Sequence, residues 1–345
     1  MIYNDFILDN ILDNYFDTNI IKQHDNVIIA LSGGIDSMCL FDIMFKLKSE
    51  INYNLYAIHV NHGIRGLEAE GDENFVRKYC KDFNIKLFVS KVDAISFSKN
   101  NNLTLEEAGR ILRYKEFDNL YQKLKKKNIN TFILTAHHKK DQVETILHNI
   151  IRGSGLKGLC GMSNIKKYII RPMLNISKND IEKYVETNNI PYRTDSTNDD
   201  INFTRNYLRK EIINKLYTIN NKFDDHIIML SNQVKDVTDY INNVSNYIYN
   251  YICIEKDKTK IIIDLKKFND VHIAIKSNII KIIFNELVDT LKDFANVHIL
   301  DIINLCNKEK GGHLDLPYNI TVDKIKNTII FKKNKINISM SRRKK

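Results

Sequence analysis

Paired cysteines are missing from this chain of 345 residues. Its five cysteines are scattered and include no Cys-x-x-Cys pair: Cys39, Cys80, Cys160, Cys253 and Cys306. This spacing argues against a disulfide framework, a zinc ribbon and an iron–sulfur site. We therefore expect five reduced thiols and a cytoplasmic location.

Long apolar runs and a secretory leader are also missing. No stretch approaches the roughly 18 uncharged apolar residues of a membrane span. The first ten residues, MIYNDFILDN, carry acids where a signal peptide has a basic start. We expect no membrane contact. Apolar residues make up 43% of the chain, which is enough to build a core and excludes a largely disordered protein.

Glycine is scarce in the second half of the chain. Ten of the twelve glycines fall at or before Gly161. Glycine allows tight turns and close approach of the backbone to a ligand. Small-molecule chemistry is therefore expected in the first half.

Positive charge is concentrated in the second half. Residues 1–200 hold 27 Lys and Arg against 26 Asp and Glu, whereas residues 201–345 hold 25 against 16. Such an asymmetry indicates a polyanionic partner for the second half. The alternative is a solvated tail, because Arg342–Lys345 supply four of the nine excess charges.

Strands and helices alternate through the first half. Apolar runs predict strands at 27–31, 55–60, 87–92, 131–136 and 168–170. Helical patterns lie between them at 36–47, 69–83, 104–126 and 140–151, and Ser177 is a good N-cap for another helix. This alternation predicts an α/β fold with a doubly wound parallel sheet, whose ligands bind beyond the carboxyl ends of the strands.

The pattern changes after about residue 210. Helices are expected at 222–252 and twice within 272–305, with short strands at 261–265, 313–316 and 328–332. We predict a catalytic domain over residues 1–212, a smaller and mainly helical domain over 213–335, and a basic tail over 336–345.

A Gly-rich loop, Ser32-Gly33-Gly34-Ile35-Asp36-Ser37, joins the first strand to a helix. Its glycines, hydroxyls and helix N-terminal amides suit a phosphate. It is neither a Walker A loop nor a dinucleotide fingerprint. The acid in this loop, Asp36, implies a divalent cation or a cationic group on the substrate. The alternative is an ordinary strand–helix turn.

The helix at 140–151 has an apolar stripe and a separate polar face. The stripe consists of Val143, Ile146, Leu147, Ile150 and Ile151. Asp141, Glu144 and His148 share another face at spacings of three and four. Two carboxylates near the start of a helix suit a cationic amine such as lysine, which must be deprotonated before it attacks. The alternative is a solvated acidic face.

Other polar residues follow the predicted strands. His137 and His138 are adjacent, so their side chains diverge and a shared zinc ion is not expected. Arg113 and Arg152 are candidates for neutralising phosphate, or for pairing with helix acids. His59 and His62 follow the second strand, where they could line a site; for His59 a structural role is an equal alternative.

The loop resembles the SGGxDS pyrophosphatase loop of the PP-loop ligases, which cleave ATP to AMP and pyrophosphate. Within this superfamily, further segments resemble the tRNA(Ile)-lysidine synthetases, also called synthases. They occur in the family's order: His59–Gly66, Glu106–Tyr114, Ala136–Thr145, Arg152–Gly161, Arg171–Leu174, Asp195–Asn198 and Arg205–Arg209. The match spans about residues 20–215. The related tRNA thiolases need Cys-x-x-Cys pairs that this chain lacks.

The resemblance implies an adenine nucleotide α-hydrolase-like fold and assigns the site. ATP would be bound by Ser32, Gly33, Gly34, Ile35, Asp36, Ser37, His59, His138, Arg152 and Gly153. Catalytic roles fall to Asp36, Asp141, Glu144 and Arg113, with Mg²⁺ at Asp36. The family has Asp where this chain has Lys140, which could pair with Glu144 four residues on; we read this change as tolerated.

The implied reaction joins free lysine to the wobble cytidine of tRNA(Ile) with a CAU anticodon, through an adenylated cytidine. We expect the basic second domain to hold the tRNA by its phosphates. Longer members carry a further C-terminal domain, which we expect this chain to lack. The oligomeric state stays open, with a homodimer as one option. Two alternatives also stay open: another PP-loop ligase, and a non-catalytic RNA-binding paralogue.

Overall fold

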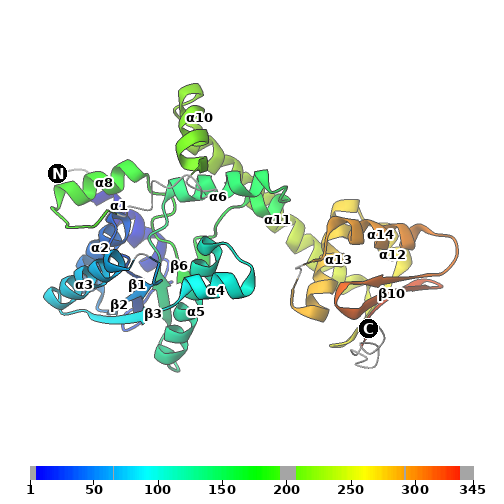
Figure 1. Cartoon of the computed structure of the whole chain (residues 1–345). Helices are drawn as coiled ribbons and strands as arrows, with labels where there is room; N and C mark the ends of the chain where they lie inside the picture. The colour runs from blue at the N-terminus through cyan, green and yellow to red at the C-terminus, as the bar shows by residue number, and fades with distance from the viewer. Residues whose placement is uncertain (1–4, 65, 195–206, 291–292, 335–345) are drawn as a thin grey trace. The chain divides into compact units, whose positions relative to one another are not determined.

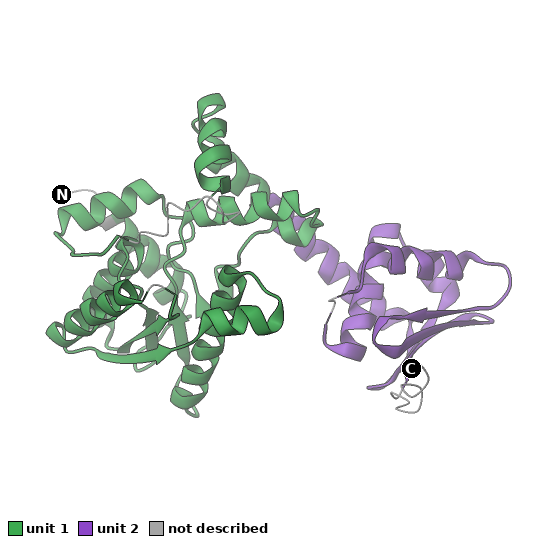
Figure 2. Cartoon of the chain, in the orientation of Figure 1, with its two compact units in different colours: residues 1–232 green, residues 233–345 purple. Residues whose placement is uncertain are grey.

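The computed structural model describes residues 5–64, 66–194, 207–290 and 293–334. The chain divides into two compact units, residues 1–232 and residues 233–345 (Figure 2). The division falls inside helix α11 (Phe223–Ile252), later than the boundary expected at residue 212. The start of α11 belongs to unit 1 because it packs there: the Ser231 hydroxyl donates to the carbonyl of Cys160 at 3.0 Å.

Unit 1 contains a six-stranded sheet with the order β3-β2-β1-β4-β6-β5 (Figure 1). The strands are β1 (Asn26–Ala30), β2 (Asn54–Asn61), β3 (Lys86–Lys91), β4 (Thr131–Leu134), β5 (Ile165–Lys166) and β6 (Ile169–Ile170). All neighbouring pairs are parallel except β5 with β6. The predicted doubly wound α/β fold is confirmed. The edge pair β5–β6 replaces the single strand expected at 168–170.

Helices cover both faces of this sheet because β1 is apolar on both. Val27 and Ile29 belong to the core cluster on the side of α2 (Ile35–Ile51) and α8 (Lys178–Thr187). The residue between them, Ile28, packs with Phe117 of α5 (Leu105–Leu124) on the other side. Successive side chains of a strand point to opposite faces, so a continuous apolar run indicates a doubly covered strand.

The other helical segments of unit 1 include six that the sequence did not signal. They are α1 (Asp5–Ile11), η1 (Leu12–Phe16), α3 (Leu67–Asp82), α4 (Ala94–Asn101), α6 (Lys139–Ile151), α7 (Leu156–Leu159), η3 (Leu208–Ile213) and α10 (Asn214–Ile219). The missed ones are α1, η1, α4, α7, η3 and α10.

The strand order reverses between β1 and β4. The chain passes from β1 outward to β2 and β3, then returns to place β4 on the other side of β1. The carboxyl ends of β1 and β4 therefore diverge into loops that leave a crevice, the usual ligand position in open α/β sheets.

Unit 2 is built on a five-stranded antiparallel sheet with the order β7-β8-β11-β10-β9. Its strands are β7 (Cys253–Lys256), β8 (Lys260–Asp264), β9 (Gly312–Leu316), β10 (Ile320–Ile325) and β11 (Thr328–Lys333), and η4 (Pro317–Asn319) precedes β10. The end of α11 and helices α12 (Leu265–Asn269), α13 (Ile273–Val288) and α14 (Asn296–Asn307) complete the unit.

The core of unit 2 lies between the sheet and its helices. Alternate residues of β8 and β11, such as Ile261, Ile263, Ile329 and Phe331, are buried with residues of α13 and α14. The three expected strands are present, and the short strands β7 and β10 join them. In the part of the chain that is described, no helix is long and apolar enough to cross a membrane.

Candidate active site

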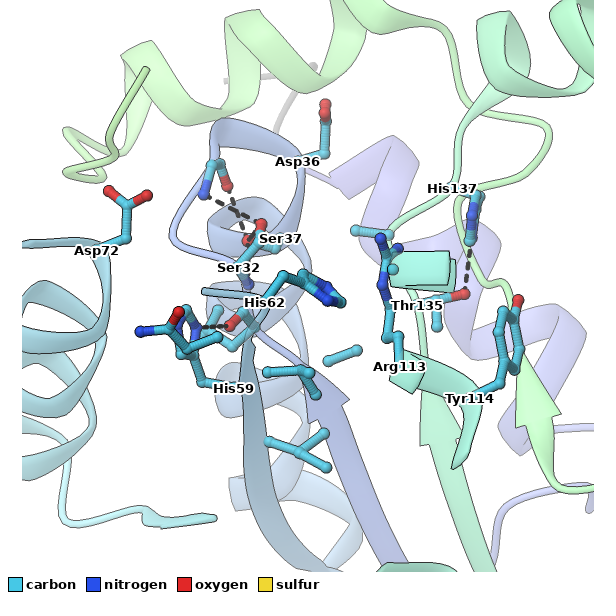
Figure 3. Close-up of a pocket in the computed structure, with 18 of the residues that line it drawn as sticks. Ser32, Asp36, Ser37, His59, His62, Asp72, Arg113, Tyr114, Thr135 and His137 are labelled. Atoms are coloured by element: carbon cyan, nitrogen blue, oxygen red, sulfur yellow. Dashed lines mark hydrogen bonds between the residues drawn. The ribbon is translucent and has the colours of Figure 1, made fainter. Parts of the chain in front are cut away.

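A cavity of about 590 Å³ opens at the carboxyl ends of β1, β2 and β4, in the crevice where the strand order reverses (Figure 3). Helices α5 and α6 complete its walls. Its polar lining comprises Ser32, Asp36, Ser37, His59, Asn61, His62, Asp72, Glu106, Arg113, Tyr114, Thr135, His137, Asp141, Glu144 and Arg209. The structure thus brings together most of the residues that the sequence marked as candidates.

The Gly-rich loop is held in shape by its own serines. The hydroxyl of Ser37 accepts hydrogen bonds from the amides of Ser32 and Gly33, both at 3.2 Å, and donates to the carbonyl of Gly34 at 2.9 Å. The hydroxyls of Ser32 and Ser37 lie 3.0 Å apart. Ser37 is buried, so its first role is to shape the loop.

Gly33 is needed for the conformation of the loop. Its φ is +93°, which L side chains rarely adopt, and an added Cβ would lie 3.4 Å from Phe75 and Val76 of α3. The amide of Arg193 donates to the Gly33 carbonyl at 2.9 Å. The Arg193 guanidinium pairs with Asp72 at 2.5 Å, so the segment after α8 is attached to the loop and to α3.

The carboxylate of Asp36 has a protein cation beside it. Lys178 Nζ lies 2.5 Å from Asp36 Oδ1, and His138 Nε2 lies 3.8 Å from Oδ2. Lys178 was not among the candidates. It occupies the first turn of α8, where the helix dipole disfavours a cation. A lysine in the first turn of a helix is stabilised by a nearby anion. Its position in the sequence is therefore the signal that could have identified Lys178 as a candidate.

Arg209 of η3 contacts both of the carboxylates that were predicted on α6. Arg209 Nε and Nη2 donate to the two oxygens of Glu144 at 2.6 and 3.0 Å. Its Nη2 also lies 3.6 Å from Asp141 Oδ1. The alternative of a solvated acidic face is therefore wrong, because Glu144 is buried and both acids line the cavity.

The two acids differ in their affinity for protons. Burial raises the pKa of Glu144, although Arg209 opposes the shift. Burial also acts on Asp141, but the positive fields of His138 and His137, the His138 amide and Arg209 together hold its pKa below the ordinary value. Neighbouring carboxyls whose pKa values diverge are typical of sites with one proton acceptor and one permanent anion.

The side chains of the adjacent His137 and His138 diverge, as expected. His137 lines the cavity, with Nδ1 2.9 Å from the Thr135 hydroxyl. His138 is buried, and its Nε2 lies between Asp36 and Asp141, at 3.8 and 3.7 Å. The structure thus places His138, the predicted ATP ligand, between the loop acid and the α6 acid, and sets His137 in the wall of the cavity.

His137 makes the stability of the fold dependent on pH. Burial, helped by nearby arginines, lowers its pKa from 6.5 to about 4. Between these values the unfolded chain binds a proton that the folded chain does not, so stability is full above pH 6.5 and falls on acidification. We expect His137 to contribute up to about 3 kcal/mol to this loss.

Urea unfolding at a series of pH values measures this effect. His137→Gln should lose that part of the pH dependence, and His226→Gln, which changes an exposed histidine on α11, should keep it. An unchanged pH profile in His137→Gln would contradict the assignment.

His59 serves structure and lines the cavity. Its Nδ1 lies 2.8 Å from the carbonyl of Leu31, which ties the end of β2 to β1. Burial lowers its pKa, so the ring is neutral, Nδ1 donates, and Nε2 is left as an acceptor. His62 packs against Gly109 of α5, and Arg113 lines the same wall.

Three other candidates lie away from the cavity or contact other groups. Arg152 and Gly153 follow the last turn of α6, about 18 Å along the helix from its start, and do not line the cavity. Lys140 does not pair with Glu144 in the described structure; its ammonium lies 5.9 Å from the ring centroid of Tyr217. Arg65 and residues 195–206, which include the Asp195–Asn198 motif, lie outside the described residues.

The lining provides one carboxylate suited to a phosphate-bound cation. Within the described ranges, no cluster of three or more His, Cys, Asp or Glu side chains could hold a metal by itself. Mg²⁺ commonly takes one or two carboxylates and completes its shell with substrate phosphates and water. Asp36, partly exposed beside the loop, fits that arrangement.

Known proteins resemble this chain in sequence and in fold. A family model described as a PP-loop domain matches residues 7–216. The tRNA(Ile)-lysidine synthases of Caldanaerobacter subterraneus subsp. tengcongensis and Clostridioides difficile are each 34% identical to the chain. The alignments cover 92% and 96% of this chain and 67% and 71% of the relatives.

A third relative and a solved structure extend the comparison. The tRNA(Ile)-lysidine synthase of Petrotoga mobilis is 36% identical over 71% of this chain and 76% of its own length. The structure of the U34-tRNA thiolase NcsA from Methanococcus maripaludis superposes with a TM-score of 0.54 at 19% identity. It covers 67% of this chain and 78% of the thiolase, and this likeness shows a shared fold.

Proposed function

Because this chain belongs to the tRNA(Ile)-lysidine synthase family of PP-loop enzymes, which use ATP to modify tRNA, we propose that it joins free lysine to carbon 2 of the wobble cytidine of a tRNA(Ile) with a CAU anticodon. One observation carries the proposal. A phosphate-type loop and a pair of carboxylates, of which Glu144 is buried, line the same cavity. The first suits ATP and the second suits an amine.

The proposed reaction has two steps. The 2-carbonyl oxygen of cytidine attacks the α-phosphorus of ATP, and the bond to pyrophosphate breaks. The lysine side-chain amine then attacks carbon 2, the carbon–oxygen bond breaks, and AMP leaves with that oxygen. The cytidine must be unstacked to enter the cavity, which costs least in a single-stranded anticodon loop.

The loop residues act on the phosphates. The amides of Ile35, Asp36 and Ser37 precede the first hydrogen bond of α2, from Met38 to Gly34, and so suit the leaving pyrophosphate. Lys178 and Arg113 would balance its charge. Mg²⁺ held by Asp36 with the phosphates would supply further charge stabilisation.

The α6 residues act on lysine. Asp141 would stay ionised and hold the ammonium, and Glu144, whose pKa burial raises, would accept its proton. Arg209 pairs with both acids. Lysine binding would therefore replace part of the Arg209 contact with an ammonium.

Incorporation of labelled lysine tests the proposal. The full chain is incubated with a tRNA bearing a CAU anticodon, with and without ATP, and with the same tRNA bearing a CAC anticodon. Lysine should enter the CAU tRNA only with ATP, releasing AMP and pyrophosphate. Pyrophosphate release without lysine transfer would overturn the lysine assignment and leave a different PP-loop reaction.

The basic tail is the part of the second half best suited to tRNA phosphates. Residues 233–334 hold 15 Lys and Arg against 13 Asp and Glu, whereas residues 335–345, outside the described residues, hold five and none. Deleting Arg342–Lys345 should lower the slope of log affinity against log salt by at most about three units.

A salt series of tRNA affinity measures that slope. The matched control deletes four neighbouring uncharged residues, 336–339, and should leave it unchanged. An unaltered slope after loss of the four charges would show that the tail makes no phosphate contacts.

A further inference from the structure

Helix α11 carries an exposed apolar stripe within unit 2. We name it the α11 seam: Val237, Tyr240, Val244, Tyr247 and Tyr251. Val237, Tyr240, Tyr247 and Tyr251 are 52%, 69%, 78% and 66% exposed, and Val244 is half-buried. Three tyrosines exposed to this degree on one helix face bury little apolar surface in the chain itself. Such a face is typical of a surface that binds a partner.

The helix does not need the seam to pack in unit 2. A different face, with Tyr249 and Ile252, is buried in the unit 2 core. The hydroxyl of Tyr249 donates to Glu286 of α13 at 2.8 Å, and Asn278 of α13 donates to Asn242 at 3.0 Å. The apolar arc of α11 is therefore wider than the part that the unit covers.

The spacing of the seam is that of a coiled-coil contact. Its residues follow one another at intervals of three, four, three and four, which are the a and d positions of a heptad. Two heptads on an isolated peptide would be marginal because the helix must first be ordered. Here the packing of α11 in unit 2 has already ordered the helix, so association loses less conformational entropy.

The charges beside the seam favour protein over RNA. Asp236 precedes Val237 and lies four residues from Tyr240, and Asp239 precedes Tyr240; both acids are exposed beside the seam. A phosphate backbone would meet these carboxylates. Lys267 lies over the Tyr251 ring, with Nζ 4.0 Å from its centroid, and so contacts one end of the seam.

We propose that the seam binds the seam of a second copy of this chain, with the two helices antiparallel. In that register Val237 of one copy faces Tyr247 of the other, and Tyr240 faces Val244. Tyr240 and Tyr247 then each meet a valine, Tyr251 faces Gln233 of the other copy, and the arrangement is self-complementary about a two-fold axis near residue 242. The flanking Asn243 and Asn250 bring no like charges together.

The area available sets the expected strength. A tyrosine side chain buries about 150–250 Å², so the exposed parts of the seam amount to roughly 1,000 Å² over both copies. That is the lower end of specific interfaces. We therefore expect a reversible dimer with a Kd of about micromolar order.

Sedimentation of the full chain tests the proposal, at concentrations from about 1 to 200 µM to span that range. Wild type should shift from monomer to dimer, and Tyr247→Glu should weaken association at least about tenfold, because it buries an unpaired charge. The control Asn246→Glu adds the same charge to the same helix, one residue away on an exposed polar face, and should associate like wild type. Circular dichroism checks that each variant is folded.

Cysteine cross-linking tests the orientation. A mixture of Tyr240→Cys and Val244→Cys chains should form disulfide-linked heterodimers under mild oxidation, beyond what wild type forms through its own cysteines. A monomeric wild type over the whole range overturns the proposal. So does unchanged association of Tyr247→Glu together with weaker tRNA binding, which would make the seam an RNA contact.

Discussion

Asp36→Asn is expected to abolish lysine ligation while leaving the fold intact. The change removes one charge and almost no volume. It also removes the anion that Lys178 and His138 face and the carboxylate proposed to hold Mg²⁺. Loss of electrostatic stabilisation at the leaving group should lower kcat by at least about 100-fold.

Lysine transfer and pyrophosphate release, measured together, check this result. Glu50→Gln alters an exposed acid on the same helix and should keep wild-type rates. Thermal unfolding of both variants separates catalysis from stability. Near-normal activity of Asp36→Asn would contradict both the cation role and the importance of the Lys178 pair.

Glu144→Gln is expected to block the lysine step more than the ATP step. The amide keeps the shape of the side chain but cannot accept a proton from the ammonium. General-base catalysis typically contributes about 10²–10⁴ in rate. We therefore expect kcat/KM for lysine to fall by at least about 100-fold, while the KM for ATP stays near that of wild type. Asp141→Asn should act in the same direction, chiefly by raising the KM for lysine.

Steady-state kinetics with lysine and ATP varied separately measure the two effects. Asp225→Asn is the matched control, because it removes an exposed acid that pairs with Lys139 at the start of the same helix. Equal changes in both KM values would indicate that these carboxylates act on ATP or a metal ion and not on the amine. The melting temperature of Glu144→Gln should also fall, since the change removes the ion pair that the buried Glu144 carboxylate makes with Arg209.

The interplay of Arg209 and lysine follows from the same geometry. Arg209 donates to both oxygens of Glu144, and its charge opposes the burial that raises the Glu144 pKa. When an ammonium approaches, the two cations compete for one carboxylate. Transfer of the ammonium proton to Glu144 would neutralise its carboxylate and weaken the ion pair with Arg209, while Asp141 would keep its negative charge beside Arg209.

Local sequence determined the framework of unit 1. The apolar runs of β1, β2 and β4 have no polar alternation, so each had to be covered on both faces, and this predicts the parallel sheet. The loop around Gly33 followed from glycine's conformational freedom, and its φ of +93° confirms the need. The two acids of α6 followed from helical periodicity, which places residues three apart on one face.

Tertiary structure decided which of these groups meet. The ion pair between Lys178 and Asp36 joins residues 142 positions apart, and Arg209 reaches Glu144 across 65. No periodic pattern encodes such contacts. Tertiary structure also decided which of His137 and His138 lies between the two acids, because this depends on how the loop after β4 enters α6. The position of Arg152 is a further case, because the thirteen-residue helix α6 places it away from the cavity. The sheet of unit 2 was only partly visible in the sequence. Strand β7 is largely exposed and has little apolar pattern of its own. The pairing of β8 with β11, which joins Asp264 to Thr328, depends on the tertiary fold.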